Sequence, residues 1–175
     1  TPIIVPDDFP LPADGVHIRW PDPFLATEAR MHDYKVYAAL HYCRVNQLNR
    51  IVIDSPRPRL GIATSGKSYL DVRQALEDLG ITEQDAADMG IRVFKIAMPW
   101  PLEPEGVRHF AEGLEEILVV EEKRQVVEYQ LKEQLYNWRD DVRPRVVGKF
   151  DEKGEWVRPH GDWLLPAAGE LTPAM

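Results

Sequence analysis

The chain has 175 residues, of which 44% are apolar and 29% are charged, and it carries a net charge of −8. This composition is typical of a folded protein, and the length allows one compact domain with extended flanking segments. An acidic chain without a basic face excludes nucleic acid as its expected partner. There is no run of about 18 apolar residues, so neither a transmembrane helix nor a membrane partner is predicted.

The titratable side chains give no sign of a metal centre. Cys43 is the single cysteine, so the chain cannot form an internal disulfide or ligate an iron–sulfur cluster by itself. The five histidines do not follow the spacing of metal ligands. We therefore predict no metal site, and a packed rather than nucleophilic Cys43. The opening residues lack the basic start and apolar run of a secretory leader, and the expected compartment is the cytoplasm.

Two segments precede the predicted core. Six prolines fall within the first 24 residues. Because proline lacks the backbone N–H that helices and sheets require, residues 1–24 are predicted to form an extended arm. In residues 25–50 apolar and aromatic side chains recur three and four positions apart, which predicts a linker helix.

Residues 51–143 alternate between short branched stretches and amphipathic ones. Strands are predicted at RIVID, at RLGIATSG, within IRVFKIAMPWPLEP before its proline-rich part, and at ILVV, and each of them except the first is followed by at least one helix. This order favours an α/β core in which helices cover both faces of a mainly parallel sheet, a three-layer α/β/α arrangement. In the first of these helices, residues 67–80, the expected buried stripe is Leu70, Val72, Ala75, Leu76 and Leu79.

Residues 144–175 are predicted to lie outside that core. VVGKF and EWV, residues 146–150 and 155–157, are expected to pair as a hairpin around the turn sequence DEKG. The prolines and glycines that follow predict an extended C-terminal arm.

The stretch GIATSGKS, residues 61–68, has the letters of a nucleotide-binding P-loop, G-x-x-x-x-G-K-S. In a working P-loop the strand ends before the first glycine, and the following amides surround the phosphate. Here the residues most typical of a strand, 60–63, lie inside the motif, and the residues before it are broken by prolines. Glu121 follows a later strand where a magnesium ligand would be expected, but it can equally mark the start of the next helix.

The end of this motif nevertheless keeps part of the chemistry. Ser65, Gly66, Lys67 and Ser68 form a strand-to-helix turn with unpaired amides at a helix N-terminus, which attracts anions. Three interpretations stay open for the turn. It can be a helix cap with a solvated lysine, a site for a small anion or a phosphate-bearing ligand, or a true P-loop.

Three long stretches, taken together and in this order, resemble a known family: RLGIATSGKSYLDVRQALEDLGI, KIAMPWPLEPEGVRHFAEGLEEILVVEEKR and VVGKFDEKGEWVRPHGDWLLPAAGELTP. They are similar to the middle segment of indolepyruvate:ferredoxin oxidoreductase, in particular its long fused bacterial form. The resemblance runs from about Val16 to the end of the chain.

The resemblance implies a transketolase C-terminal-like domain, placed between the two domains that bind thiamine diphosphate. For the full enzyme it implies oxidative decarboxylation of arylpyruvates to acyl-CoA, with electrons passed to ferredoxin. Thiamine diphosphate, Mg and 4Fe–4S clusters are its implied cofactors, CoA and ferredoxin its partners, and a homo-oligomer its assembly.

The chain departs from the whole enzyme, because the family's thiamine pyrophosphate motif, G-D-G followed by N-N, is absent. No catalytic residue can therefore be carried over, and Glu121 and Glu122 do not correspond to the glutamate that activates thiamine. We expect a non-catalytic structural domain that contacts the other domains of the same enzyme and holds no cofactor of its own. The alternatives are a phosphate- or nucleotide-binding protein of the P-loop kind and a stand-alone assembly module.

Overall fold

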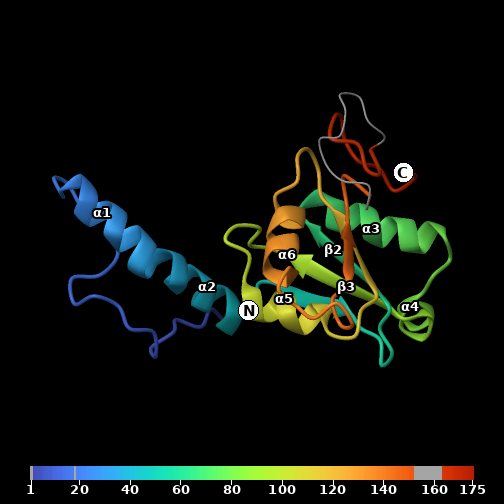
Figure 1. Cartoon of the computed structure of the whole chain (residues 1–175), viewed down its shortest axis with the longest axis horizontal. Coiled ribbons are helices and arrows are strands. Elements are labelled where there is room, and N and C mark those ends of the chain that lie inside the picture. The colour runs from blue at the N-terminus through green and yellow to red at the C-terminus, as the bar shows by residue number, and fades with distance from the viewer. Residues whose placement is uncertain (1, 18, 152–162) are drawn as a thin grey trace. The chain divides into compact units, whose positions relative to one another are not determined.

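The computed structural model describes residues 2–17, 19–151 and 163–175. The chain divides into two compact units, Thr1–Leu48 and Asn49–Met175 (Figure 1).

The first unit is a helical segment with an extended arm folded against it. The helical residues form α1 (Phe24–Arg30), a single π-helical turn (Met31–Lys35) and α2 (Val36–Val45). Two contacts fix the start of the arm: Ile4 and the Asn46 side chain exchange two hydrogen bonds of 2.8 Å, and His41 Nε2 lies 2.8 Å from Asp8 Oδ1. Cys43 is buried, as the sequence predicted.

The second unit contains a five-stranded sheet in the order β1-β3-β2-β4-β5. β2, β3, β4 and β5 run parallel, and β1 is antiparallel to β3. The mainly parallel sheet predicted from the sequence is therefore confirmed. The strand bounds are β1 Arg50–Ile53, β2 Leu60–Ser65, β3 Ile91–Ile96, β4 Glu116–Val120 and β5 Arg145–Val147.

Helices cover both faces of this sheet, so the three-layer α/β/α arrangement is also confirmed (Figure 1). Successive strand residues point to opposite faces: Ile62 packs into the core beneath α3 (Lys67–Asp78) and α4 (Glu83–Met89), whereas Ala63 packs into the core beneath α5 (Pro104–Ala111) and α6 (Val127–Leu135). The second core is the larger and includes the stacked rings of Phe94 and Phe110, whose centroids are 4.8 Å apart.

Local chemistry sets where two of these helices begin. At α4, Thr82 and Asp85 form a capping box, in which each side chain accepts the other residue's backbone N–H. At α5, the Glu103 carboxylate accepts the N–H groups of Glu105 and Gly106, and Pro104 occupies the first helical position.

The buried stripe predicted for α3 is wrong in part. Val72 and Leu76 are buried, but Leu70 and Leu79 are 63% and 73% exposed. The buried face instead continues through Ser68, which lies four residues before Val72 and therefore on the same side of the helix. A serine was not counted as a core residue, although its position one turn before a buried valine is a core position.

The first half of the predicted hairpin pairs with β4. Val146 and Val147 pair in parallel with Ile117 and Leu118 of β4, so β5 extends the sheet beyond residue 143. A further strand on β4 gives its outer backbone groups partners, and Val147 is buried. The expected second half of the hairpin, residues 155–157, lies outside the described residues.

Candidate functional site

In open α/β sheets, ligands bind where two neighbouring parallel strands are connected in opposite directions, just beyond the strands' carboxyl ends. Here that position lies between β2 and β4, because the chain leaves β2 for β3 on one side and then returns to β4 on the other. The two loops that meet there are the predicted turn before α3 and the residues between β4 and α6. We call this place the switch-point crevice.

The structure places all four residues of the predicted anion-binding turn in this crevice. Ser65 ends β2, and Gly66 occupies the N-cap position of α3 with φ 56° and ψ −134°, a conformation that favours glycine. Gly66 offers no side-chain cap to the helix. The Ser68 hydroxyl is buried and has no hydrogen-bond partner among the described residues, so a cap by Ser68 is not found.

Lys67 is engaged by its own protein. Its Nζ donates to Asp71 Oδ2 at 2.9 Å and to the Leu171 carbonyl at 2.8 Å. It also lies 3.7 Å from Glu122 and 3.3 Å from Glu170. The hydrogen bond to Asp71 raises the pKa of Lys67 above its ordinary value, with Glu170 acting in the same direction. Three carboxylates around one ammonium group leave this turn without the positive charge that an anion requires, so anion binding stays a prediction that the geometry disfavours.

The segment that reaches Lys67 is the end of the chain. We call residues 163–171 the C-terminal strap. Three lysines donate to carbonyl oxygens along it: Lys149 to Pro166 at 2.9 Å, Lys123 to Gly169, and Lys67 to Leu171.

The backbone N–H groups of the strap are held as well. The Leu171 N–H donates to Glu122 Oε1 at 3.3 Å, and the Leu164 N–H donates to the Lys149 carbonyl at 3.0 Å. Leu171 is 4% exposed. The strap is therefore held against the residues that follow β2, β4 and β5 by its backbone and one buried side chain.

Two acidic residues near the crevice, Glu121 and Glu128, accept hydrogen bonds that stabilise the fold. The Glu121 carboxylate accepts the N–H groups of Val126, Val127 and Glu128 at 2.9, 2.9 and 3.0 Å, and so caps α6. This confirms the interpretation of Glu121 as the start of a helix. Glu128 is fully buried, and it accepts from Lys132 Nζ at 2.7 Å and from the Lys149 N–H at 2.8 Å.

Lys149 itself is fully buried, although it carries an ammonium group. Burial lowers the pKa of Lys149 below its ordinary value, and the nearby carboxylates of Glu121 and Glu128 oppose that shift only in part. The sequence predicted an extended arm in this part of the chain, but not the contacts of Lys149 and of the strap. Their contacts join residues 17 to 104 positions apart, and no local pattern signals them.

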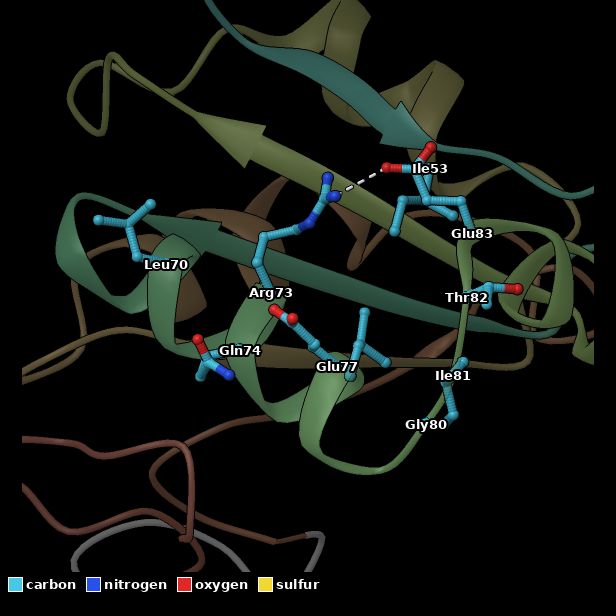
Figure 2. Close-up of a pocket in the computed structure, with 10 residues that line it drawn as sticks. Ile53, Leu70, Arg73, Gln74, Glu77, Gly80, Ile81, Thr82 and Glu83 are labelled. Carbon is cyan, nitrogen blue, oxygen red and sulfur yellow. Dashed lines mark hydrogen bonds and ion pairs between the residues drawn. The ribbon is translucent and has the colours of Figure 1, made fainter.

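A hollow of about 520 Å³ lies beside α3. Its lining comes from α3, the turn that leads to α4, and Ile53 of β1 (Figure 2). An ion pair of 2.8 Å joins Arg73 to Glu83 there. Leu70, which was predicted to be buried, lies on the rim of this hollow. These groups form no acid–base pair near a nucleophile.

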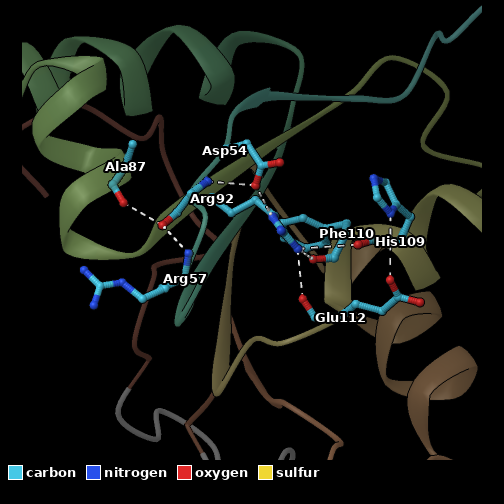
Figure 3. A network of polar contacts seen from close by, with 8 residues as sticks. Asp54, Arg57, Ala87, Arg92, His109, Phe110 and Glu112 are labelled. Carbon is cyan, nitrogen blue, oxygen red and sulfur yellow. Dashed lines mark hydrogen bonds and ion pairs between the residues drawn. The ribbon is translucent and has the colours of Figure 1, made fainter.

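The amino-terminal ends of the parallel strands, which we call the amino edge, carry a polar network (Figure 3). Arg92 of β3 is 8% exposed. Its Nε donates to Asp54 at 2.6 Å, and its Nη1 donates to the carbonyls of Phe110 and Glu112 at 3.0 and 2.9 Å. The arginine thus satisfies the carbonyls that the end of α5 leaves unpaired, which is a structural task.

Among the residues that the structure describes, no group of three or more His, Cys, Asp or Glu side chains is placed to hold a metal ion. No helix there is long and apolar enough to cross a membrane.

Comparison with known proteins gives relatives of one kind. The chain is similar to the indolepyruvate oxidoreductase subunit IorA of Pyrococcus abyssi, with 34% identity over 114 residues, 65% of this chain and 14% of that protein. It is 28% identical to the IorA subunit of Methanothermobacter thermautotrophicus over 170 residues, 93% of this chain and 26% of that protein. The chain therefore spans a minor part of the length of these curated relatives.

Two solved structures are also similar in backbone. One is the 2-oxoglutarate:ferredoxin oxidoreductase from Magnetococcus marinus, with a TM-score of 0.47, 17% identity, and coverage of 73% of this chain and 21% of that one. The other is a split-gene transketolase, an inactive β4 tetramer, with a TM-score of 0.43, 16% identity, and coverage of 62% and 34%.

The family model described as the indolepyruvate ferredoxin oxidoreductase middle domain matches residues 49–175, which include every strand and helix of the second unit. By this match, the chain belongs to the indolepyruvate ferredoxin oxidoreductase middle domain family.

Proposed function

We propose that this chain is a non-catalytic structural domain of a thiamine diphosphate-dependent indolepyruvate (arylpyruvate):ferredoxin oxidoreductase, an enzyme that oxidatively decarboxylates 2-oxo acids to acyl-CoA. Membership of the middle-domain family supports the enzyme class. The observation that carries the non-catalytic role is the set of contacts between the strap and the loops at the switch-point crevice. Where a parallel sheet would bind a substrate or cofactor, this domain binds its own strap through Lys67, Lys123 and Lys149.

The cofactors of such an enzyme would be held by its other domains. A 4Fe–4S cluster takes four cysteine thiolates, and this chain offers one buried thiol, Cys43, so the cluster does not fit here. Glu121 accepts three backbone N–H groups, which commits it to α6 rather than to Mg or thiamine diphosphate. The partners proposed for the full enzyme are its other domains, CoA, ferredoxin and further copies of itself, in the cytoplasm.

The test is a variant of the full-length enzyme assayed for arylpyruvate- and CoA-dependent reduction of ferredoxin. Lys67→Met, at the centre of the crevice, should leave kcat within about twofold of the parent. Lys35→Met, in the first unit, is the matched control for loss of a lysine. A fall in kcat of about tenfold or more for Lys67→Met alone, with unchanged thermal stability, would contradict the proposal.

A phosphate-binding role remains the second candidate, because one observation favours it. The hydroxyls of Thr64 and Ser68 are buried at the end of β2 and the start of α3 and have no hydrogen-bond partner among the described residues. Calorimetric titration with Mg-ATP, and separately with CoA, tests this role. We expect no heat of binding up to millimolar ligand, whereas binding that is lost in Lys67→Met would support the phosphate site.

The third candidate, a stand-alone assembly module, is separated by the size of the native polypeptide. An immunoblot of source cells should show a band several times larger than 20.1 kDa if the domain belongs to a fused enzyme. A band at 20.1 kDa would instead mean a separate subunit or module.

A further inference from the structure

We propose that the first unit carries a two-fold interface, through which it pairs with the first unit of a second copy of this chain. The interface is centred on a hollow of about 520 Å³ in this unit, whose lining comes from both the extended arm and the helical segment. We call it the first-unit hollow. The inference does not depend on the enzyme class, because the first unit lies outside residues 49–175, which the family model matches.

The lining of the first-unit hollow has the composition of a protein interface. Trp20 and Phe24 are 96% and 95% exposed, and Met31 is 44% exposed. Arg19 and Arg30 line the hollow beside them. Tryptophan, phenylalanine, methionine and arginine are enriched where proteins associate. Burial of these apolar side chains against a partner would remove from water the surface that the first unit leaves exposed.

Four of the lining residues form a stripe along the helical segment. They follow one another at intervals of four, three and four residues: Phe24, Glu28, Met31 and Lys35. Residues three or four apart lie on the same side of a helix. The π-helical turn does not move Lys35 away from this side, because Lys35 still lines the hollow.

The charges of the stripe favour a second copy as the partner. Glu28 and Lys35 have opposite charges, and neither has a hydrogen bond or ion pair within the described part of the chain. They lie three and four residues to either side of Met31. When two stripes cross antiparallel about a two-fold axis near Met31, Glu28 of each copy meets Lys35 of the other. A partner with a single sign of charge would instead oppose one of the two with its like.

The same arrangement matches a large side chain to a small one. The pairing that sets residue 28 against residue 35 also sets Phe24 of one copy against Ala39 of the other, and an alanine leaves room for a ring. An aromatic side chain buries about 150–250 Å², so Trp20 and Phe24 of both copies would together bury about 600–1,000 Å². That area is close to the roughly 1,000 Å² that a specific interface needs.

Sedimentation equilibrium of the full chain tests the self-association. Glu28→Lys and Lys35→Glu each place two pairs of like charges in the interface, and each should weaken association by at least about thirtyfold. Lys35→Met removes the attraction without adding repulsion and should weaken association by less than about tenfold. Asp33→Lys is the matched control, because it reverses a charge in the π-helical turn but off the stripe, and it should leave association within about threefold. A parent chain that stays monomeric up to about 100 μM, or one whose association survives both stripe reversals, overturns the proposal.

Mixing the two reversal variants separates a second copy from any other partner. The Glu28→Lys stripe carries two lysines and the Lys35→Glu stripe carries two glutamates, so each repels its own kind and attracts the other. Native mass spectrometry of an equimolar mixture should show heterodimers that form within about threefold of the parent affinity, and the doubly reversed chain should again pair with itself. A mixture of folded variants that stays monomeric overturns the proposal.

Crosslinking locates the axis without changing a charge. Residue 31 of the two copies lies near the two-fold axis, so Met31→Cys chains should be joined by a short bifunctional maleimide. Met89→Cys is the matched control, because Met89 is 57% exposed and lies in α4, outside the first unit. The native Cys43 is buried, which keeps the background of the parent chain low. Equal crosslinking of the two variants overturns the proposal.

Discussion

The amino-terminal and carboxyl-terminal ends of the parallel strands, the amino edge and the carboxyl edge, are stabilised by different contacts. At the amino edge, one buried arginine, Arg92, bonds Asp54 and the last carbonyls of α5. At the carboxyl edge, Lys67, Lys123 and Lys149 donate to three carbonyls of the C-terminal strap. The planar fork of an arginine can satisfy several fixed carbonyls at once, whereas each lysine is a single point charge. The amino edge therefore depends on one side chain that joins several groups, whereas the carboxyl edge depends on a set of separate contacts.

Breaking the amino edge should have the largest effect. Arg92→Met removes the donor to the carbonyls of Phe110 and Glu112 and leaves the buried Phe110 carbonyl without that donor. We expect a loss of about 3 to 5 kcal/mol in the free energy of unfolding, measured by urea denaturation. Arg73→Met is the matched control, because its ion pair with Glu83 is exposed and should contribute less than about 1 kcal/mol. Similar losses for the two variants would contradict the central role of Arg92.

The second-largest effect on stability is expected at the carboxyl edge, at the start of α6. Glu121→Ala removes the acceptor of three N–H groups at the start of α6, and we expect a loss of about 2 kcal/mol in the free energy of unfolding. Glu122→Ala, at the next position, loses one 3.3 Å bond to the strap and should cost less than about 1 kcal/mol. A larger loss for Glu122→Ala would mean that the strap, rather than the α6 cap, dominates this edge.

These two glutamates also mark how far the sequence leads. The interpretation of Glu121 as a helix start depends on residues up to seven positions apart. The capping box of Thr82 and Asp85 joins residues three positions apart. Interactions between residues so close in the chain can be predicted from the sequence. The parallel sheet follows from the alternation of strands and helices for the same reason. Elements whose partners are near in sequence were therefore predictable.

The features that could not be predicted depend on contacts between residues far apart in the sequence. The strap contacts of Lys67 and Lys149 join parts of the chain that only the finished sheet brings together. Leu70 was assigned to the core on hydrophobicity alone, and Ser68 was left out for the same reason, yet the register of α3 on β2 exposes one and buries the other. The switch-point crevice could be located from strand order, but its occupant could not.

The two lysines at the ends of the strap contacts should respond to pH in opposite directions. Burial lowers the pKa of Lys149 below 10.5, so unfolding takes up a proton between that lowered pKa and 10.5. The stability contribution of Lys149 therefore rises as pH rises through this window. The bond to Asp71 raises the pKa of Lys67 above 10.5, so its contribution is present below 10.5 and is lost as pH rises through the raised pKa.

Urea denaturation between pH 8 and pH 11 separates these contributions. Lys149→Met should remove the rise, and Lys67→Met should remove the fall above 10.5, so each variant is the control for the other. If Lys149→Met leaves the pH profile of the parent unchanged, the ammonium group of Lys149 is not desolvated by the folded chain.

The smallest expected effect, and the one that decides what holds the strap, is that of Lys67→Met at neutral pH. The Lys67 side chain is 42% exposed and shares its charge among Asp71, Glu122 and Glu170, so solvent and salt screen each pair. We expect a loss of less than about 1 kcal/mol in the free energy of unfolding, and the loss should shrink further on raising salt. Leu171→Ala, which empties a buried position, should cost about 2 kcal/mol or more at any salt concentration. A loss in the free energy of unfolding for Lys67→Met as large as that for Leu171→Ala, and unchanged at high salt, would contradict this expectation. The polar contacts of the carboxyl edge would then contribute as strongly as those of the amino edge.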